Sequence, residues 1–154
     1  MNNYVDPVVI MEARRDRKFV LCIVGNRHTN IKMLRTVLPR AIEKFKEMHC
    51  VEIGVIIQRG AEGNVDDEAL SYAIKNQIRC FDCRALYKYF GKKLAGPIRN
   101  KIMATDSDGL IAFWDFKCKA VGDAIKKFRR KGKPVMVLSL LSRASSDQNS
   151  EDSY

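Results

Sequence analysis

The sequence has no long apolar segment and few cysteines, and these two absences exclude large classes of protein. No apolar run approaches the ~20 residues that a helix needs to cross a bilayer, and residues 1–18 show no signal-peptide pattern. The five cysteines are odd in number and scattered, which indicates reduced thiols rather than a disulfide framework. We therefore expect a cytoplasmic protein that has no membrane partner.

Signatures of metal and cofactor binding are also scarce. Cys80 and Cys83 have CxxC spacing, but the chain has only two histidines and no second ligand pair at zinc-finger spacing. The glycine patterns GxGxxG and GxxxxGK[ST] are absent, which argues against a dinucleotide Rossmann domain and a P-loop NTPase. We expect no metal site and no resident cofactor.

The chain is instead rich in positive charge. Its 154 residues include 28 lysines and arginines against 18 acidic residues, a formal net charge of +10. Such an excess attracts nucleotides, nucleic acids or acidic headgroups. The length suits one domain, and 46% hydrophobic with 30% charged residues is typical of a folded globular chain. We expect one basic domain with an anionic partner.

Apolar runs alternate with helical periodicities along most of the chain. Continuous apolar runs, typical of strands buried on both faces, predict strands at 18–25, 51–57, 78–82, 108–114 and 134–140. Amphipathic spacing and capping signals predict helices at 31–48, 65–75, 97–105 and 119–131. We expect Pro39 to bend or interrupt the first helix and Pro97 to open the third. The alternation predicts an α/β fold, a Rossmann-like three-layer sandwich with a mainly parallel sheet of about five strands.

The two ends differ in composition from the rest. Residues 1–16 show no clear period, so we expect an N-terminal arm before a domain that spans residues 17–141. Residues 142–154 are acidic and serine-rich and have nothing apolar to bury, which predicts a disordered tail.

Glycine-containing or acidic loops follow three of the predicted strands. They are Gly25-Asn26-Arg27, Arg59-Gly60-Ala61-Glu62-Gly63 and Asp115-Phe116-Lys117-Cys118. Ligands of open parallel sheets bind beyond the carboxyl ends of the strands. Glycine lets a backbone approach a phosphate closely, and helix N-termini offer N–H donors to anions. We therefore expect a ligand at this edge.

Three strings carry a resemblance to a known family. They are Ala95-Gly96-Pro97-Ile98-Arg99-Asn100-Lys101-Ile102-Met103, Ser107-Asp108-Gly109-Leu110-Ile111-Ala112-Phe113-Trp114-Asp115 and Gly132-Lys133-Pro134-Val135. Over residues 19–138 the chain resembles the YspA-like, cpYpsA-related branch of the SLOG superfamily. Gly25-Asn26-Arg27 stands where that branch has Gly-Ser-Arg, and residues 60–66 stand where it has Gly-Gly-Ala-x-Gly-Ala-Asp.

The resemblance implies a Rossmann-like fold and a nucleotide or nucleotide-derived ligand. The superfamily includes the DNA-processing protein DprA and the LOG phosphoribohydrolases, as well as members proposed to sense nucleotide-derived signals. The expected ligand-binding residues are Gly25, Asn26, Arg27, Arg59, Gly60, Ala61, Gly63, Asp66, Arg99, Asn100, Trp114, Asp115 and Cys118. Among these, Trp114 either stacks on a base or ribose or only caps the core.

The chain also departs from the family pattern. Relatives have Ser-x-Gly-Thr after the fourth strand, where this chain has Cys118-Lys119-Ala120-Val121. The second loop begins Gln58-Arg59 instead of Ser-Gly. Arg59 either replaces the lost donors with a charged fork or fills the pocket and blocks it.

Catalysis is less strongly indicated than binding. LOG enzymes use an Arg and a Glu as their catalytic pair; Arg99 falls on the Arg, whereas the Glu position falls on Ala124. Asp123 is next to that position, and its helical offset predicts that it faces another way. Cleavage of an N-glycosidic bond normally needs a placed carboxylate. We expect a binding or sensing protein, with Arg99 and Asp66 as candidates if it is a nucleotide hydrolase.

A basic stretch supplies the competing hypothesis. Residues 117–133 hold eight lysines and arginines and a single carboxylate. A helix face of this kind fits a nucleic-acid backbone; the candidate contacts are Lys119, Lys126, Lys127, Arg129 and Arg130. The sequence is also compatible with a homo-oligomer.

Overall fold

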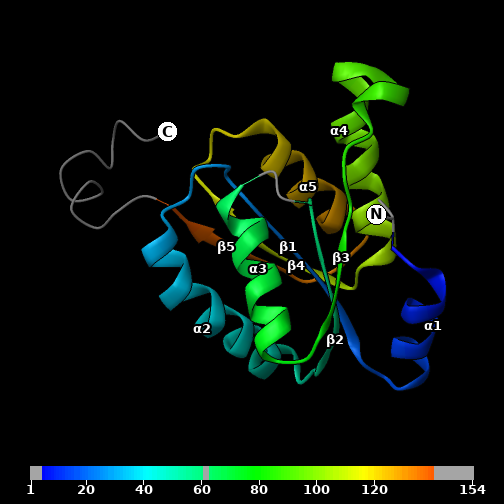
Figure 1. The fold of residues 1–154 in the computed structure, drawn as a ribbon, viewed down its shortest axis with the longest axis vertical. Helices are drawn as coiled ribbons and strands as arrows, with labels where there is room; N and C mark the ends of the chain where they lie inside the picture. Colours follow the sequence, from blue (N-terminus) through cyan, green and yellow to red (C-terminus); the bar gives the residue numbers. More distant parts are fainter. Residues whose placement is uncertain (1–4, 61–62, 141–154) are drawn as a thin grey trace.

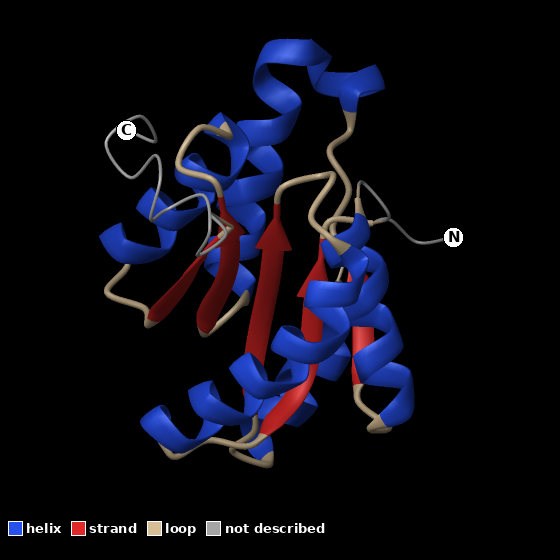
Figure 2. Cartoon of the chain, turned by 90° about the vertical axis from the view of Figure 1, so that its left-hand side faces the viewer, coloured by secondary structure: helices blue, strands red, loops and turns tan. Residues whose placement is uncertain are grey.

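The fold is a five-stranded parallel sheet enclosed by helices. A computed structural model describes residues 5–60 and 63–140. The strands are Phe19–Gly25 (β1), Ile53–Gln58 (β2), Arg79–Asp82 (β3), Gly109–Trp114 (β4) and Val135–Ser139 (β5). Every strand pair is parallel, and the order across the sheet is β3-β2-β1-β4-β5 (Figure 2). The five strands expected from the apolar runs are thereby confirmed.

Helices cover both faces of the sheet and complete the three layers (Figure 1). They are Pro7–Arg15 (α1), Ile31–His49 (α2), Asn64–Lys75 (α3), Tyr87–Asp106 (α4) and Lys119–Arg130 (α5). Side chains of α2 and α3 join one hydrophobic core, and side chains of α1, α4 and α5 join the other. Within residues 5–60 and 63–140, no helix is long and apolar enough to cross a bilayer.

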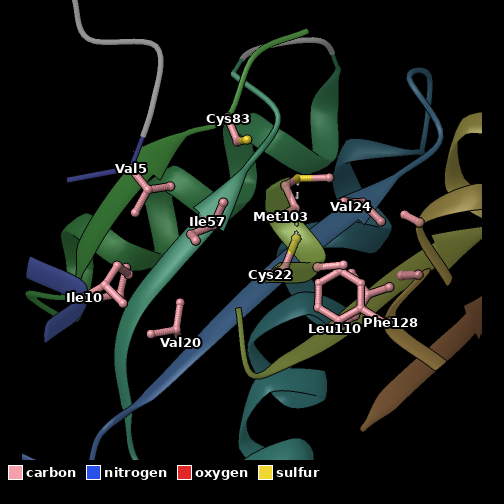
Figure 3. Packing of buried hydrophobic residues seen from close by; sticks show 14 of the residues in the cluster. Val5, Ile10, Val20, Cys22, Val24, Ile57, Cys83, Met103, Leu110 and Phe128 are labelled. Carbon is pink, nitrogen blue, oxygen red and sulfur yellow. Dashed lines mark hydrogen bonds between the residues drawn. The ribbon is translucent and has the colours of Figure 1, made fainter. Parts of the chain in front are cut away.

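The central strand β1 is buried on both faces, as its uninterrupted apolar run predicts. Val20, Cys22 and Val24 pack into the core beneath α1, α4 and α5, where Met103 and Phe128 also lie (Figure 3). The Cys22 sulfur is 3.6 Å from the Met103 sulfur. Burial, the largest influence, raises the pKa of the Cys22 thiol far above its usual range and keeps it protonated.

Residues 7–15 differ from the expected N-terminal arm because they form helix α1. The Asp6 side chain caps the helix by accepting the Val8 backbone N–H at 2.9 Å, and Pro7 occupies the first turn. Val9, Ile10 and Ala13 are buried against the sheet. The apolar residues 8–11 are contiguous in sequence, so their helical period is not visible. The expected tail at 142–154 lies outside the described residues.

Two prolines also behave differently from expectation. Helix α2 continues through Pro39 without interruption. Helix α4 begins ten residues before the expected start at Pro97, which lies inside it. An interior proline removes one backbone hydrogen bond without forbidding helical dihedral angles. The break falls instead at Gly91, whose φ of 77° is one that glycine tolerates. The first turns of α4 rise beyond the carboxyl edge of the sheet (Figures 1 and 2).

The strand order reverses between β1 and β4. Connections from β1 lead to β2 and β3 on one side, and β4 and β5 extend the sheet on the other. Gly25 at the end of β1 lies in register with Phe113 near the end of β4. Ligands of open α/β sheets bind at such a reversal, so this edge is the place to look for a site.

Candidate ligand site

The loops after β1 and β4 are joined by hydrogen bonds. The Asn26 backbone N–H donates to the Phe113 carbonyl at 3.1 Å, and the Asn26 side-chain oxygen accepts the Asp115 N–H at 3.3 Å. The Thr29 hydroxyl donates to the Asn26 carbonyl at 2.7 Å. The hydrogen bonds of Asn26 therefore hold the two loops together at the reversal point.

The loop after β2 is closed by a buried ion pair. The Arg59 backbone N–H donates to the Asp66 carboxylate at 3.0 Å, and the Arg59 Nε atom lies 3.6 Å from the same oxygen. The Arg59 guanidinium also donates to the Gly25 carbonyl. Exposed fractions of 5% for Arg59 and 1% for Asp66 show that this pair fills the space between the β1 and β2 loops.

The glycines of these two loops allow close packing between protein groups. A Cβ atom on Gly25 would lie 2.5 Å from a methyl carbon of Val65, and one on Gly63 would lie 2.5 Å from the Arg27 carbonyl oxygen. Gly60 has a φ of 86° and faces the Arg84 side chain. At Gly25 and Gly63, the atoms that lie this close belong to the protein's own Val65 and Arg27. Ala61 lies outside the described residues.

The loop after β4 leads into helix α5 through a turn that the Asp115 carboxylate closes. Asp115 accepts the backbone N–H groups of Lys117 and Cys118, each at 2.8 Å. Burial opposes its ionisation, but the hydrogen bonds from Cys118, Lys117 and Asn26 outweigh this and lower the pKa of Asp115. Cys118 is the N-cap of α5 and supplies no side-chain cap. The first turn of α5 thus keeps backbone N–H groups for another acceptor.

Trp114 has a structural position beside the same helix. Its indole N–H donates to the Cys118 carbonyl at 2.9 Å, and its ring centroid lies 4.8 Å from that of Phe116. A Cβ atom on Gly122 would lie 2.9 Å from the indole. Trp114 does not line either of the two cavities described next, so its packing favours the core-capping alternative.

A basic cavity of about 680 Å³ lies beside the first turn of α5. We name it the basic cavity. Its lining includes six cationic side chains: Arg27, Arg59, Lys92, Lys93, Arg99 and Lys119. Among the described lining residues the one carboxylate is Asp123. The excess of positive charge and the uncapped helix N-terminus both favour an anion here.

Asp123 is held by contacts with α4 and with its own helix. It lines the basic cavity, and its carboxylate accepts from Asn100 at 2.9 Å and from the Lys127 amine at 2.6 Å. The Asn100 oxygen in turn accepts the Arg99 Nε–H at 2.9 Å. Burial raises the pKa of Asp123, but hydrogen bonds from Lys127 and Asn100 outweigh it, and the net shift is downward. Ala124 is buried in the core, so Asp123 does face another way than the Glu-equivalent position, and that direction is into the basic cavity.

A second cavity of about 930 Å³ lies at the reversal point of the sheet. We name it the apolar cavity, because Met33 and Val37 of α2, Phe113 of β4 and Leu138 of β5 contribute to its wall. Asn26 and Asp115 also line it. The two cavities share two lining residues, Arg27 and Cys118.

The expected site residues therefore divide into two groups. Seven line a cavity: Asn26, Arg27, Arg59, Arg99, Asn100, Asp115 and Cys118. Gly25, Gly60, Gly63, Asp66 and Trp114 do not line either one. The basic cavity is also lined by Tyr87, Lys92, Lys93 and Asp123, none of which is among the expected ligand-binding residues. The density of lysine and tyrosine just before residue 95 was the available signal.

The basic face of α5 is smaller than the sequence suggests. Lys119, Lys126, Arg129 and Arg130 are exposed. Lys127 instead donates to Asp123 and to the Pro97 carbonyl. Lys133 donates to the carbonyls of Ala104 and Thr105, and to that of Ser107, at the end of α4. These two amines therefore stabilise internal contacts.

The cysteines show no metal-binding arrangement. Over the described ranges, no group of three or more His, Cys, Asp or Glu side chains could hold a metal ion. Cys80 lies in β3, and Cys83 is buried just after it. Burial, the largest influence, raises the pKa of Cys80 to about 12, so this thiol stays protonated at neutral pH.

Comparison with known proteins identifies the fold. The chain matches no protein-family model and no curated protein sequence. It is similar in structure to DNA processing protein A (DprA) from Streptococcus pneumoniae, with a TM-score of 0.64 and 17% sequence identity. The match covers 95% of this chain and 59% of the other, so this chain spans a little over half of that protein's length. The likeness confirms the Rossmann-like α/β fold that the sequence predicts.

Proposed function

We propose that the protein binds or senses a nucleotide or nucleotide-derived ligand, with the anionic part of the ligand in the basic cavity. The observation that carries this proposal is the cavity's composition: six cationic side chains, of which Arg59 is paired with the buried Asp66, and one lining carboxylate. The cavity also lies beside the N-terminus of α5, which has no side-chain cap. Arginine forks and backbone N–H groups are the donors that proteins use for phosphate. A nucleotide supplies that anion at the strand edge where such folds bind ligands.

Sequence and fold support the same proposal. The strings around Arg99 and Asp108 resemble the YspA-like branch of the SLOG superfamily, and the structure shares its fold with a protein whose name describes DNA processing. We propose membership of that superfamily and of that branch. The cytoplasmic location expected from the sequence remains a prediction.

Thermal unfolding with a ligand panel tests the proposal. The panel contains ribonucleoside mono- and diphosphates, cyclic dinucleotides, NAD, ADP-ribose and ribose 5-phosphate. A ligand at a hundred times its Kd stabilises by about 2.7 kcal/mol, which raises Tm by several degrees in a domain of this size. Absence of any shift across the panel would refute the proposal.

Two charge reversals on one helix localise the binding. Lys119→Glu places a negative charge in the basic cavity, whereas Lys126→Glu places it on the exposed face of α5 outside the cavity. The Tm shift is expected to shrink in the first variant and to persist in the second. Equal loss in both variants would indicate a general charge effect instead of a site.

A hydrolase is the second candidate function, and the position of Asp123 favours it. A carboxylate held ionised by Lys127 and Asn100 lies in the same cavity as Arg99. Breaking an N-glycosidic bond develops positive charge on the ribose, which such a carboxylate stabilises. Asp66, the carboxylate proposed from the sequence, is buried in its pair with Arg59.

Base release measures this second function directly. Each nucleotide that raises Tm is incubated with the protein, and the free base is separated and quantified. Hydrolysis predicts release that Asp123→Asn lowers by a factor on the order of 10² or more. If the bound nucleotide stays intact, the protein binds without turnover and the hydrolase candidate is excluded.

A nucleic-acid backbone binder is the third candidate. The observation that favours it is the exposed set Lys126, Arg129 and Arg130 on the outer face of α5. The affinity for an oligonucleotide should fall steeply with salt and be lost in the double variant Lys126→Glu with Arg130→Glu. Lys127 is a poor probe because it holds Asp123. Binding that survives this double variant would exclude the α5 face.

A further inference from the structure

The apolar cavity and the basic cavity meet at a shared boundary. Arg27, which follows β1, and Cys118, which begins α5, line both. The volumes, about 930 and 680 Å³, each fall within the range of a complete small-molecule site. A ligand that placed only a phosphate at this edge would use one of the two.

The two cavities offer opposite chemistry. The basic cavity presents six cationic side chains, whereas the apolar cavity presents Met33, Val37, Phe113 and Leu138 from both helix and sheet. An apolar wall of this kind favours an uncharged group, because burying apolar surface on both partners removes it from water. A second phosphate would find few cations there.

The charged groups of the apolar cavity are already engaged or shared. The Asp115 carboxylate accepts the backbone N–H groups of Lys117 and Cys118, and Arg27 lies at the boundary with the basic cavity. The side-chain oxygens of Asn26 and Asn30 accept backbone N–H groups as well. The amide N–H₂ group of Asn30 can donate to the acceptor atoms of a heteroaromatic ring.

We infer that the ligand has two parts, a nucleobase in the apolar cavity and a phosphate in the basic cavity, with its ribose passing Arg27 and Cys118. This inference rests on the proposed function and adds the substrate class: a nucleoside phosphate or a larger nucleotide, as opposed to a sugar phosphate or a free phosphate. Val37 and Met33 become residues that determine base affinity.

Isothermal titration calorimetry with fragments separates the two parts. The probes are AMP, GMP, CMP, UMP and ribose 5-phosphate, the last of which keeps the anion and lacks the base. At least one nucleotide should bind about tenfold or more tightly than ribose 5-phosphate, since burial of an aromatic ring contributes at least that factor. If ribose 5-phosphate binds as tightly as all four nucleotides, the inference fails and the proposed anion site survives. If none of the five binds and no member of the thermal-unfolding panel raises Tm, the proposed function itself fails.

A filled cavity then tests where the base lies. Val37→Trp places a large side chain into the apolar cavity, and Thr36→Trp is the matched control on the exposed side of the same helix. The inference predicts that Val37→Trp removes the preference for the nucleotide and leaves the affinity for ribose 5-phosphate unchanged, whereas Thr36→Trp alters neither.

Further variants keep the test decisive. Met33→Trp fills the same cavity from one turn earlier and replaces Val37→Trp if that variant does not show a cooperative unfolding transition. Tyr87→Ala removes the aromatic ring that lines the basic cavity. Loss of base preference in Tyr87→Ala, with retention in both tryptophan variants, would overturn the inference by placing the base at the mouth of the basic cavity.

Discussion

On the β2 side of the carboxyl edge protein groups occupy the space between the loops, whereas on the β4 side a cavity stays open. We call the first the closed side, made of Gly25, Gly63 and the buried Arg59–Asp66 pair, and the second the open side, made of the first turn of α5 and the basic cavity. Arg59 lies between the two, because it pairs with Asp66 and also lines the basic cavity. On the closed side the Asn64 N–H donates to the Arg27 carbonyl at 3.1 Å, and the Arg59–Asp66 pair is almost fully buried. On the open side α5 has no side-chain cap.

This contrast shows how similar residue types serve different purposes in one fold. Both sides carry an arginine and an aspartate near a helix N-terminus. Asp66 is in the first turn of α3 and pairs with Arg59, and their mutual burial leaves no room for a ligand between them. Asp123 is half-exposed and shares its cavity with Arg99. Stability should therefore depend mainly on the closed side, and binding on the open side.

The largest expected effect is loss of the buried pair on the closed side. Asp66→Ala leaves Arg59 as a buried charge without its carboxylate, so the free energy of unfolding should fall by about 3–5 kcal/mol. Asp123→Ala on the open side breaks a partly exposed pair with Lys127 and should cost about 1 kcal/mol or less. Urea denaturation measures both variants. Equal losses would remove the distinction between the two sides.

A pair of glycine substitutions should give the next largest difference. A Cβ atom on Gly63 would lie 2.5–2.9 Å from backbone atoms of Arg27 that cannot move aside alone, so Gly63→Ala should destabilise by about 1–3 kcal/mol. Gly96 lies in α4 with nothing beyond its chain neighbours within 4 Å of an added Cβ. Alanine there gains helix propensity, but its Cβ meets the ring of Pro97, so the two effects oppose each other and Gly96→Ala should change the free energy of unfolding by less than about 1 kcal/mol. Denaturant midpoints at constant slope decide the sign of each effect.

Most of the sheet was predictable because its strands are buried on both faces. The unbroken apolar runs around Cys22 and Ile111 have few alternatives to a parallel strand, and each predicted strand lies within two residues of the observed one. Helix α1 and the first turns of α4 were missed. Their periodicity is hidden by contiguous apolar residues at 8–11 and by Gly91, so only tertiary packing reveals them.

The site was only partly predictable, since a family pattern gives positions without giving contacts. The expected cluster around Arg99 and Asn100 does line a cavity. The sequence could not decide whether Arg59 offers a fork to a ligand or fills a gap. The role of Arg59 depends on its contacts with Asp66 and with the Gly25 carbonyl, which only the fold brings next to it. Asp123 faces another way than Ala124, as its helical offset predicts, but only the packing of α4 against α5 shows that this direction leads into the cavity of Arg99.

Arg27, which follows β1, tests whether binding depends on the open side. The side chain of Arg27 is exposed, and its backbone carbonyl, which accepts from Asn64, is unchanged by substitution. Arg27→Ala should therefore leave stability within about 0.5 kcal/mol and weaken binding of ribose 5-phosphate by about tenfold. Calorimetric titration together with urea denaturation checks both statements. A large stability loss with unchanged affinity would reverse the assignment of Arg27 to the open side.

The smallest expected effect concerns pH and the Asp115 turn at the start of α5. Because its backbone hydrogen bonds lower the pKa of Asp115 in the folded protein, ionised Asp115 stabilises the fold at pH values above the ordinary carboxyl pKa of about 3.9. This contribution disappears as the pH falls through the lowered folded-state pKa. Asp115→Asn keeps an oxygen for the Lys117 and Cys118 N–H groups but removes the titration. The variant should be slightly less stable at pH 7 and converge on the parent protein as the pH falls through the lowered folded-state pKa of Asp115, as followed by thermal unfolding. Asp67→Asn, an exposed carboxylate in the first turn of α3, is the control. An Asp115→Asn curve that runs parallel to the parent at every pH would show that the charge of Asp115 does not hold this turn.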